Sequence, residues 1–432
     1  MLIPSPEAVV AQLAGQPVVW LDGGDEEAVV GWSPDEVSTS GDWVAAGRAL
    51  QRPGAGGAVL GFVGFGAGHV VEAVPAEAPT PEGPHWLGRF PGVLLRDRRG
   101  WTATGTADFR RRAASVLEAA SVHPLSPPPP AGDRAHHTVD RRTYEAGVRR
   151  ILELLAAGDA YQINLTRPVW VEGVRGLGEA YDAYRRLRSA SPASHGAWLD
   201  LGATQVLSNS PELLLRIDGD RLASDPIKGT RPRHTDPVID AALGAALLAA
   251  AKDHAELTMI VDLVRNDLGR VALPATVRAG ARRLTSHPTV HHTSCEVTAQ
   301  LRPDRDRWSA LAAVFPPGSV TGAPKVRACQ RIAELEPHPR GVYCGTIGGF
   351  LDDGPGSWSV AIRTAVVHGG RARYHVGGGI VIDSVPAEEW EETEHKGRAL
   401  AAALTSPRAR SDAAAVDQQV VGDVLQRRLE PR

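Results

Sequence analysis

Three strand-length apolar segments follow one another near the C-terminal end of the chain, at 341–350, 358–367 and 374–382. The first two are predicted to be adjacent strands, because consecutive strands usually lie side by side, and the third is predicted to be a further strand. The last segment contains Gly377, Gly378 and Gly379, and a strand with three glycines is weak unless another group packs against its backbone. The sequence therefore predicts a sheet in which one strand is closely approached by another part of the molecule.

Amphipathic helices are predicted between and after the strands. Residues 142–157 carry apolar side chains at helical spacing, and Gly158 ends the pattern. The clearest helix is predicted over 253–270, where Asp253 can cap its start. Two further helices are predicted, over 325–335 and 387–404. Strands and helices in this arrangement predict a mixed α/β protein.

A proline-rich stretch divides the chain. It contains Pro127–Pro130, which favour an extended connection and cannot continue a helix. We therefore predict an N-terminal α/β subdomain over 1–120, a linker over 121–137 and a catalytic domain over 138–405. Residues 406–432 are polar and rich in arginine, and we predict that they form a C-terminal tail.

Charge and composition argue against several classes of protein. The 432 residues carry a net charge of −3, with 47 basic and 50 acidic side chains, so no basic excess indicates a nucleic-acid partner. The first residues do not resemble a signal peptide, and no apolar run is long enough to span a bilayer. The three cysteines are too few for a disulfide framework. We expect a cytoplasmic protein.

Lysine is rare in this chain, and its positions are therefore informative. Of the 47 basic residues only four are lysines, namely Lys228, Lys252, Lys325 and Lys396. Lys228 stands directly before Gly229, which lets another group approach the backbone. Lysine can lose its proton and act as a nucleophile, whereas arginine cannot. Lys228 is therefore a candidate nucleophile, with a solvated turn lysine as the alternative.

An acidic residue is expected beside this lysine. Glu212 lies 16 residues before Lys228, and the turn at 218–220 can join two strands between them. The outer ends of such a hairpin lie at one rim of a sheet, which would bring Glu212 and Lys228 to the same site. A glutamate on an exposed strand would give the same pattern, so this alternative stays open.

Carboxylates on two predicted helices indicate a possible cation site. Glu389, Glu392 and Lys396 share one helix face, and Glu256 lies near the start of another helix. Arg363 stands inside an apolar strand and needs an anionic partner, because an unpaired buried charge is unfavourable. Together these residues fit a small carboxylate-bearing ligand held with Mg²⁺, which takes protein carboxylates plus ligand oxygens. The alternatives are a solvated helix face and, for Glu256, an interaction with the helix dipole.

The order of these stretches resembles that of the chorismate-utilising enzymes. This family includes anthranilate synthase component I, aminodeoxychorismate synthase component I, isochorismate synthase and salicylate synthase. Matching stretches run in order through residues 140–404, and among them are 159–166, 210–212, 226–233, 255–270, 317–325, 377–383 and 386–400. The resemblance implies two antiparallel β-sheets packed face to face, with helices outside.

Within the family, lysine before Gly-Thr-Arg is typical of aminodeoxychorismate synthase component I, and anthranilate synthases usually have alanine there. The resemblance implies that Lys228 attacks C2 of chorismate while Glu212 protonates the departing C4 hydroxyl. Ammonia would then add at C4 and displace the lysine, giving 4-amino-4-deoxychorismate for 4-aminobenzoate and folate biosynthesis. Gln162 stands where isochorismate and salicylate synthases use lysine to activate water, which argues against hydroxylation at C2.

The resemblance also implies the other site residues. Glu256 and Glu392 would bind Mg²⁺, with Glu389 near by. The implied substrate contacts are Gln162, Gly229, Thr230, His292, Thr321, Tyr343, Arg363, Gly377, Gly378, Gly379 and Lys396.

The implied reaction needs a source of ammonia. The chain has no cysteine in the setting of an amidotransferase nucleophile, so a separate glutamine amidotransferase subunit is expected as partner. Anthranilate synthase component I is the nearest rival function, and Lys228 argues against it. A non-catalytic chorismate-binding protein is the rival of another class, but it would need neither an acid nor a nucleophile. The segment 22–24 differs from the serine-bearing motif that holds tryptophan in anthranilate synthases, so tryptophan inhibition is not predicted.

Overall fold

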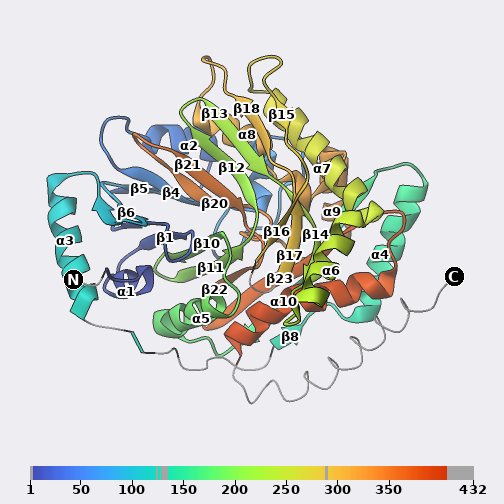
Figure 1. Cartoon of the computed structure of the whole chain (residues 1–432), viewed down its shortest axis with the longest axis horizontal. Coiled ribbons are helices and arrows are strands. Elements are labelled where there is room, and N and C mark those ends of the chain that lie inside the picture. Colours follow the sequence, from blue (N-terminus) through green and yellow to red (C-terminus); the bar gives the residue numbers. More distant parts are fainter. Residues whose placement is uncertain (1–2, 123–124, 127, 129–134, 288–289, 406–432) are drawn as a thin grey trace.

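The computed structural model describes residues 3–122, 125–126, 128, 135–287 and 290–405. Their strands form two large antiparallel sheets and one small sheet (Figure 1). The mixed α/β class and the antiparallel sheets are therefore confirmed. The predicted C-terminal tail and most of the proline-rich linker lie outside the described residues.

The three sheets take their strands from distant parts of the chain. In spatial order the first sheet contains β19 (Gly322–Ala323), β9 (Gln162–Glu172), β23 (Arg371–Ile380), β22 (Thr364–His368), β11 (Thr204–Ser210), β10 (His195–Asp200), β1 (Val18–Asp22), β2 (Ala28–Trp32), β6 (Leu94–Asp97) and β7 (Gly100–Ala103), with β8 (Ala135–His137) beside β9. The second contains β15 (Arg278–Ala279), β18 (Val297–Gln300), β13 (Arg221–Asp225), β12 (Leu213–Asp218), β21 (Gly356–Val360), β20 (Thr346–Leu351), β4 (Ala58–Val63), β5 (His85–Phe90) and β3 (Glu36–Ser38). The third contains β14 (Ile227–Pro232), β17 (Val290–Ser294) and β16 (Arg283–Ser286).

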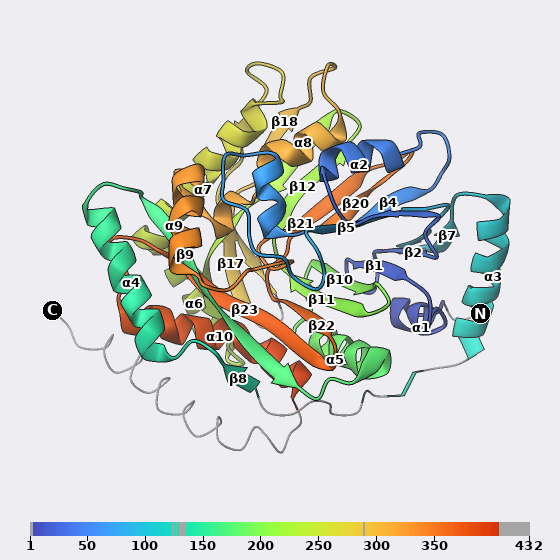
Figure 2. The same ribbon diagram turned by 180° about the vertical axis from the view of Figure 1, so that it is seen from behind.

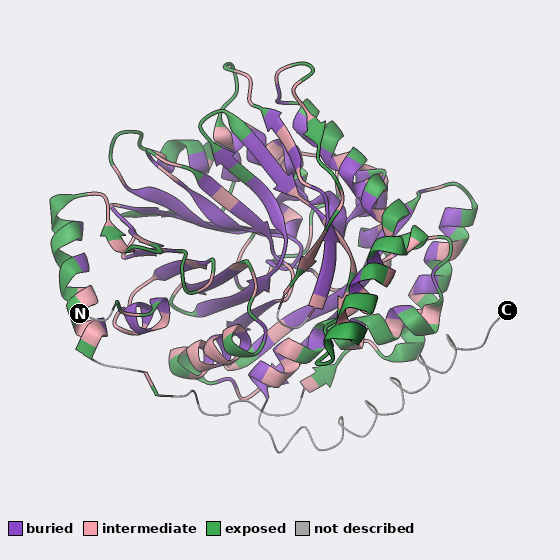
Figure 3. Cartoon of the chain, in the orientation of Figure 1, coloured by how far each residue is buried: buried purple, intermediate pink, exposed green. Residues whose placement is uncertain are grey.

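Alternation along the strands explains why the two large sheets pack face to face. In β4, Leu60 and Phe62 belong to the core between the sheets, whereas Val59 belongs to a core on the opposite face. In β1, Val19 points inward and Trp20 outward. Successive side chains on a strand point to opposite faces, so both faces of each sheet are apolar. Figure 3 shows the resulting concentration of buried residues along the strands.

Helices cover the outer faces of the sheets (Figures 1 and 2). Those packed on the first sheet are α1 (Pro6–Ala11), α3 (Ala107–Val122), α5 (Gly176–Ala190) and α10 (Pro386–Leu404). Those packed on the second sheet are α2 (Trp43–Leu50), α7 (Ala251–Gly269) and α8 (Arg307–Val314), whereas α4 (Arg141–Ala156) and α9 (Lys325–Leu335) pack on β9 of the first sheet. The helices predicted over 142–157, 325–335 and 387–404 are confirmed within one residue at each end.

One predicted helix start is wrong. Helix α7 begins at Ala251, and no side chain caps it, so Asp253 is not its N-cap. An unpredicted helix, α6 (Pro237–Ala249), ends just before it, and the single residue Ala250 joins the two helices. Asp253 instead forms an ion pair with Arg231, with 2.9 Å between Oδ2 and the guanidinium nitrogen.

The strand predicted over 358–367 is also wrong, because it is two strands in different sheets. β21 ends at Val360 in the second sheet, and β22 begins at Thr364 in the first. Between them the chain crosses from one sheet to the other, and Arg363 adopts a left-handed backbone conformation with φ 50°. A continuous apolar pattern could not reveal this crossing, since both strands are buried.

The N-terminal segment does not form a sheet of its own. β1, β2, β6 and β7 extend the first sheet, whereas β3, β4 and β5 extend the second. The division into an N-terminal subdomain and a catalytic domain stays a prediction.

Candidate active site

The predicted hairpin brings Glu212 and Lys228 to one rim of the second sheet. β12 and β13 pair from Asp218 with Arg221 at the turn to Leu213 with Asp225 at the outer end. Glu212 comes directly before β12, and Lys228 follows β13 in β14. Glu212 is 4% exposed, and Lys228 is half-buried.

Burial shifts the pKa values of these two residues in opposite directions. It raises the pKa of Glu212 to about 7, against the smaller effects of a hydrogen bond with Ser319 and of the Lys228 charge. It lowers the pKa of Lys228, and the strongest opposing influence is the carboxylate of Glu256. Near neutral pH, Glu212 therefore keeps its proton more readily than an exposed glutamate, and Lys228 loses its proton more readily than an exposed lysine.

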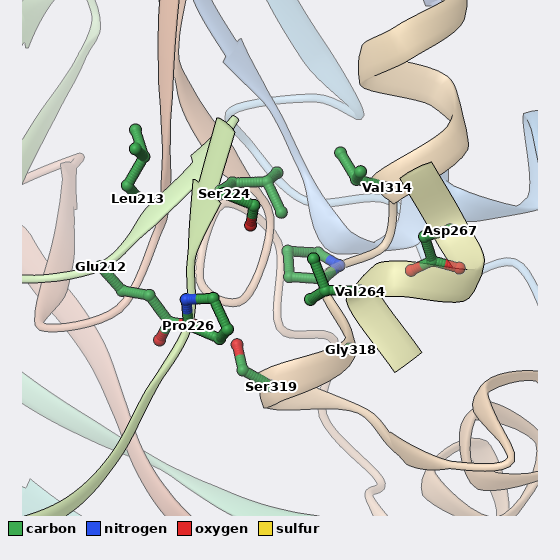
Figure 4. A pocket seen from close by; sticks show the side chains of 11 residues that line it. Glu212, Leu213, Ser224, Pro226, Val264, Asp267, Val314, Gly318 and Ser319 are labelled. Carbon is green, nitrogen blue, oxygen red and sulfur yellow. The ribbon is translucent and has the colours of Figure 1, made fainter. Parts of the chain in front are cut away.

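Ser319 contacts both residues, and the sequence analysis missed it. Ser319 lies in the 3₁₀ turn Gly318–Val320, and its carbonyl oxygen accepts from Lys228 Nζ at 3.4 Å and from Asn164 Nδ2 at 3.0 Å. Its side chain hydrogen-bonds Glu212. Figure 4 shows Glu212, Pro226 and Ser319 around one end of a small pocket. Ser319 lies in the stretch 317–325 that matches the family, but no role was predicted for it.

Thr321 was predicted to contact the substrate, but its hydroxyl forms hydrogen bonds within its own loop. Its hydroxyl donates to the carbonyl oxygens of Pro317 and Gly318 at 3.0 and 3.2 Å, and the residue is fully buried. Thr321 therefore fixes the shape of the turn that presents Ser319.

Three charged side chains of α10 meet above the glycines of β23. A Cβ atom built on Gly378 would lie 3.1 Å from Glu389 Oε2, 3.6 Å from Glu392 Oε1 and 3.9 Å from Lys396 Nζ. Lys396 Nζ donates to the Gly377 carbonyl oxygen at 2.9 Å and pairs with Glu392 Oε1 at 2.6 Å. The prediction that another group packs against this strand is confirmed. Glu389 is only 5% exposed, whereas 52% of the Glu392 side chain and 40% of the Lys396 side chain are exposed, so this helix face is buried at Glu389 and open to solvent at the other two residues.

The carboxylates offer a partial donor set for a hard cation. The charges of Lys228 and Lys252 act on both Glu256 and Glu392, so residues of α7, β14 and α10 gather here. Within the described residues, no group of three or more His, Cys, Asp or Glu side chains is arranged to hold a metal ion. Mg²⁺ commonly takes one or two protein carboxylates and completes its shell with water and ligand oxygens. Glu256 and Glu392 fit that requirement.

Arg363 and His292 provide polar groups that lack some of their hydrogen-bond or ion-pair partners among the described residues. Arg363 makes no side-chain hydrogen bond or ion pair with the residues that the structure describes, and burial lowers its pKa. Burial, followed by the Arg363 charge, lowers the pKa of His292 to about 3, so its imidazole is neutral. His292 Nδ1 lies 3.0 Å from Thr230 Oγ1, and its buried Nε2 has no hydrogen-bond partner among the residues that the structure describes. A cationic group and a free ring nitrogen suit an anionic ligand.

Gln162 and Gly229 also lie within this region. Gln162 is fully buried, donates to Asn164 Oδ1 at 3.0 Å and leaves its Oε1 atom without a partner among the described residues. A Cβ atom on Gly379 would lie 2.7 Å from Gln162 Nε2. Gly229 has φ 76°, and a Cβ atom there would lie 2.8 Å from the Leu247 side chain, so only glycine fits without strain.

Tyr343 has a different setting from the other predicted substrate contacts. Its ring stacks on His375 with 5.3 Å between centroids, and its hydroxyl hydrogen-bonds Cys344. The described contacts of Tyr343 therefore lie at the end of β23 that precedes the glycines, and its part in ligand binding stays a prediction.

A family model described as chorismate binding enzyme matches residues 21–402, which cover nearly all strands of the three sheets and every residue of the site. The chain belongs to this family. It is 43% identical over 310 residues to an aminodeoxychorismate synthase of Streptomyces griseus, covering 70% of this chain and 41% of that protein. It is 38% identical over 389 residues to an anthranilate synthase component 1 of Streptomyces coelicolor, covering 83% of this chain and 74% of that protein. This member of the chorismate-binding family thus spans less than half the length of the first relative.

Solved structures of the family share the fold. Anthranilate synthase component I from Streptococcus pneumoniae matches with a TM-score of 0.76 and 25% identity, over 87% of this chain and 92% of that one. The isochorismate synthase MenF from Escherichia coli matches with a TM-score of 0.76 and 20% identity, over 94% and 96% of the two chains. None of the helices in the described part of the chain is long and apolar enough to cross a membrane.

Proposed function

We propose that this chain converts chorismate and ammonia to 4-amino-4-deoxychorismate, the reaction of aminodeoxychorismate synthase component I. The observation that carries the proposal is the pairing of Glu212 and Lys228 at one rim, with burial acting oppositely on their pKa values. A carboxyl group that keeps its proton near neutral pH can act as a general acid. A lysine with a lowered pKa can act as a nucleophile.

The proposed reaction has two displacements. In the first, the neutral Nζ of Lys228 bonds to C2, the two ring double bonds shift, and the C4–O bond breaks. The departing oxygen takes a proton from Glu212 and leaves as water. In the second, ammonia bonds to C4, the double bonds shift back, and the C2–N bond to Lys228 breaks. The carboxylate of Glu212 takes a proton from the new ammonium group, so the acid is restored, and the net change is amine for hydroxyl with release of water.

The remaining groups would bind the two carboxylates of chorismate. Arg363 has no anionic partner among the described residues. Lys396 already forms an ion pair with a protein carboxylate, that of Glu392. Mg²⁺, held by Glu256 and Glu392, would supply positive charge where a substrate carboxylate meets these glutamates. His292 and Gln162 each present a buried polar atom that has no partner in the described part of the chain, and a ligand hydroxyl or carboxylate can satisfy it.

Anthranilate synthase component I is the second candidate. The Streptomyces coelicolor relative of that name covers more of this chain than the aminodeoxychorismate synthase does, at 83% against 70%. Anthranilate formation would release pyruvate and make the ring aromatic, and it would give Lys228 no role as nucleophile.

Product identity tests the proposal. We would incubate the pure chain with chorismate, Mg²⁺ and a high concentration of ammonium and identify products by chromatography and mass. We expect 4-amino-4-deoxychorismate, and we expect the variant Lys228→Met to form none while it still binds chorismate. Anthranilate with pyruvate would support the second candidate, and isochorismate would mean that water is the nucleophile.

We further propose that ammonia comes from a separate glutamine amidotransferase subunit. The expected result is that glutamine supports the reaction only when such a subunit is added, whereas ammonium supports it in either case. Glutamine-dependent activity of the pure chain alone would contradict this part of the proposal.

A further inference from the structure

Lys396 occupies one of the two carboxylate oxygens of Glu392. Its Nζ lies 2.6 Å from Glu392 Oε1, and Glu392 is one of the two residues suited to bind Mg²⁺. The Lys396 charge is also the main cause of the lowered pKa of Glu392. Two cations cannot share one carboxylate oxygen at contact distance without strong repulsion. Binding of a divalent cation to this oxygen therefore requires Lys396 to move.

We propose that Lys396 is a positioning residue that couples the two ligands of this site. The divalent cation displaces its ammonium group from Glu392, and the freed ammonium group then binds a carboxylate of the organic ligand. The identity of the organic ligand, chorismate, rests on the proposed function. The competition between Lys396 and the cation does not.

The surroundings of Lys396 allow this movement. The ion pair is open to solvent, with 40% of the Lys396 side chain and 52% of the Glu392 side chain exposed. Gly378 leaves room beside the ammonium group, since a Cβ atom there would lie 3.9 Å from Nζ. Lys396 Nζ also donates to the Gly377 carbonyl oxygen at 2.9 Å. This hydrogen bond can keep the ammonium group beside β23 after its ion pair with Glu392 is broken.

The ammonium group lies close enough to other groups of the site to act on their charges. Its charge contributes to lowering the pKa values of both Lys228 and His292, so it acts on the nucleophile and on the buried imidazole. His292 in turn lies under the influence of Arg363, which has no partner among the described residues. A carboxylate bound here would meet Lys396 and Arg363 together.

Coupling of this kind is reciprocal. If the cation makes the organic anion bind more tightly, the anion must make the cation bind more tightly by the same factor. Removal of the Lys396 ammonium group removes the competitor for Glu392, so the cation alone should bind more tightly. It also removes a contact with the organic anion. The factor by which the anion tightens binding of the cation should therefore decrease.

Lys252 provides a matched control. It lies in the first turn of α7, and its charge acts on Glu256, Glu389 and Glu392, as that of Lys396 acts on Glu389 and Glu392. It makes no ion pair with the residues that the structure describes, so its loss removes positive charge without removing a direct competitor. Comparison of Lys252→Met with Lys396→Met therefore separates direct competition for Glu392 from the general effect of positive charge on cation binding.

The first experiment uses Mn²⁺, a hard cation that takes the same oxygen ligands as Mg²⁺. Free Mn²⁺ is titrated by electron paramagnetic resonance into the whole chain without chorismate, and thermal unfolding checks that each variant is folded. We expect Lys396→Met to bind Mn²⁺ about fivefold more tightly than the wild type, near the lower end of typical coupling factors. Lys252→Met should change the affinity by less than about twofold. Unchanged or weaker binding by Lys396→Met, or equal tightening by Lys252→Met, overturns the proposal.

The second experiment repeats the titration with chorismate and without ammonium in the Glu212→Gln background, where turnover should be slow. Chorismate should tighten Mn²⁺ binding about fivefold or more, and Lys396→Met should abolish most of this gain. A gain that survives Lys396→Met overturns the coupling role. If chorismate does not bind at all, the proposed function fails, and the titration with Mn²⁺ alone still decides whether Lys396 competes with the cation.

Discussion

Glu212 is a carboxyl group whose task depends on its proton. If it is the general acid, Glu212→Gln should lower kcat roughly 10²–10⁴-fold, the usual contribution of such a group. Because burial raises its pKa to about 7, wild-type kcat/KM should fall as the pH rises through that value. The profile is measured at constant free ammonia, so that the titration of ammonium itself does not enter. The same fall in Glu212→Gln would assign it to another group.

The same proton affects stability. The pKa of Glu212 is higher in the folded chain than in the unfolded chain, so the folded state binds the proton more tightly. The stability gained from it is complete below the unfolded pKa of about 4.3 and is lost as the pH rises through about 7. Glu212→Gln should therefore unfold at a higher temperature than the wild type at pH 8, with a smaller difference at pH 5. Calorimetry at both values tests this, and a difference independent of pH would contradict it.

Sequence reasoning was most successful for single residues whose chemistry and spacing are local. The turn at 218–220 was sufficient to bring Glu212 and Lys228 to one rim. Ser319 was missed because it acts partly through its carbonyl oxygen, and any residue type has one. Lys252 was noted for its rarity but not placed at the site, because its approach to Glu392 depends on how α7 and α10 pack.

At the scale of elements, the three glycines of β23 differ in what surrounds them. A Cβ atom on Gly377 would lie 2.4 Å from the Leu165 carbonyl oxygen of β9, whereas one on Gly378 would meet the Glu389 carboxylate at 3.1 Å. We expect Gly377→Ala to destabilise the fold by about 1–3 kcal/mol, as overpacking does. Gly378→Ala should keep the unfolding temperature and weaken binding of Mn²⁺, because only side chains have to move.

Gly178→Ala in α5 is the matched control for both variants. No atom of the described residues lies within 4 Å of the added carbon, and alanine favours a helix, so this variant should be as stable as the wild type or more so. Equal loss of stability in Gly377→Ala and Gly378→Ala would contradict the difference between backbone and side-chain contact.

Elements with strong periodicity were predictable, and those without it were not. The helix α4 was expected from the 3.6-residue spacing of its apolar side chains. The helix α6 was missed because its apolar residues lie on all sides, and they had been considered only as a run too short for a membrane. The crossing at Arg363 was not predicted, because β21 and β22 are both apolar. The sequence pattern therefore does not change where the chain passes from one sheet to the other.

For the whole molecule, the sheets join the two predicted parts of the chain. β1 pairs with β10, and β4 pairs with β20, so each large sheet contains strands from before and after the proline-rich linker. We expect the fragment 138–405 alone to show no cooperative thermal unfolding, in contrast to the full chain, because both sheets would lose strands and expose apolar faces. Circular dichroism tests this, and a sharp transition for the fragment would mean that the second part folds independently.

Such pairings could not be predicted from local patterns, because nothing in β4 specifies which distant strand lies beside it. The resemblance to a known family supplied the architecture instead. The α/β class and the predicted helices came from the residues, whereas the face-to-face sheets came from the resemblance.

The pairing of β4 with β20 also sets an order in time. β5 can pair with one edge of β4 soon after both strands are synthesised. The other edge of β4 stays unpaired until residues 346–351 have been synthesised. At typical rates of translation this wait is on the order of tens of seconds. During it, the growing chain presents a row of unpaired backbone groups on an apolar strand, which is a known route to aggregation. The yield of folded protein should therefore depend on what shields that edge while the ribosome finishes the chain.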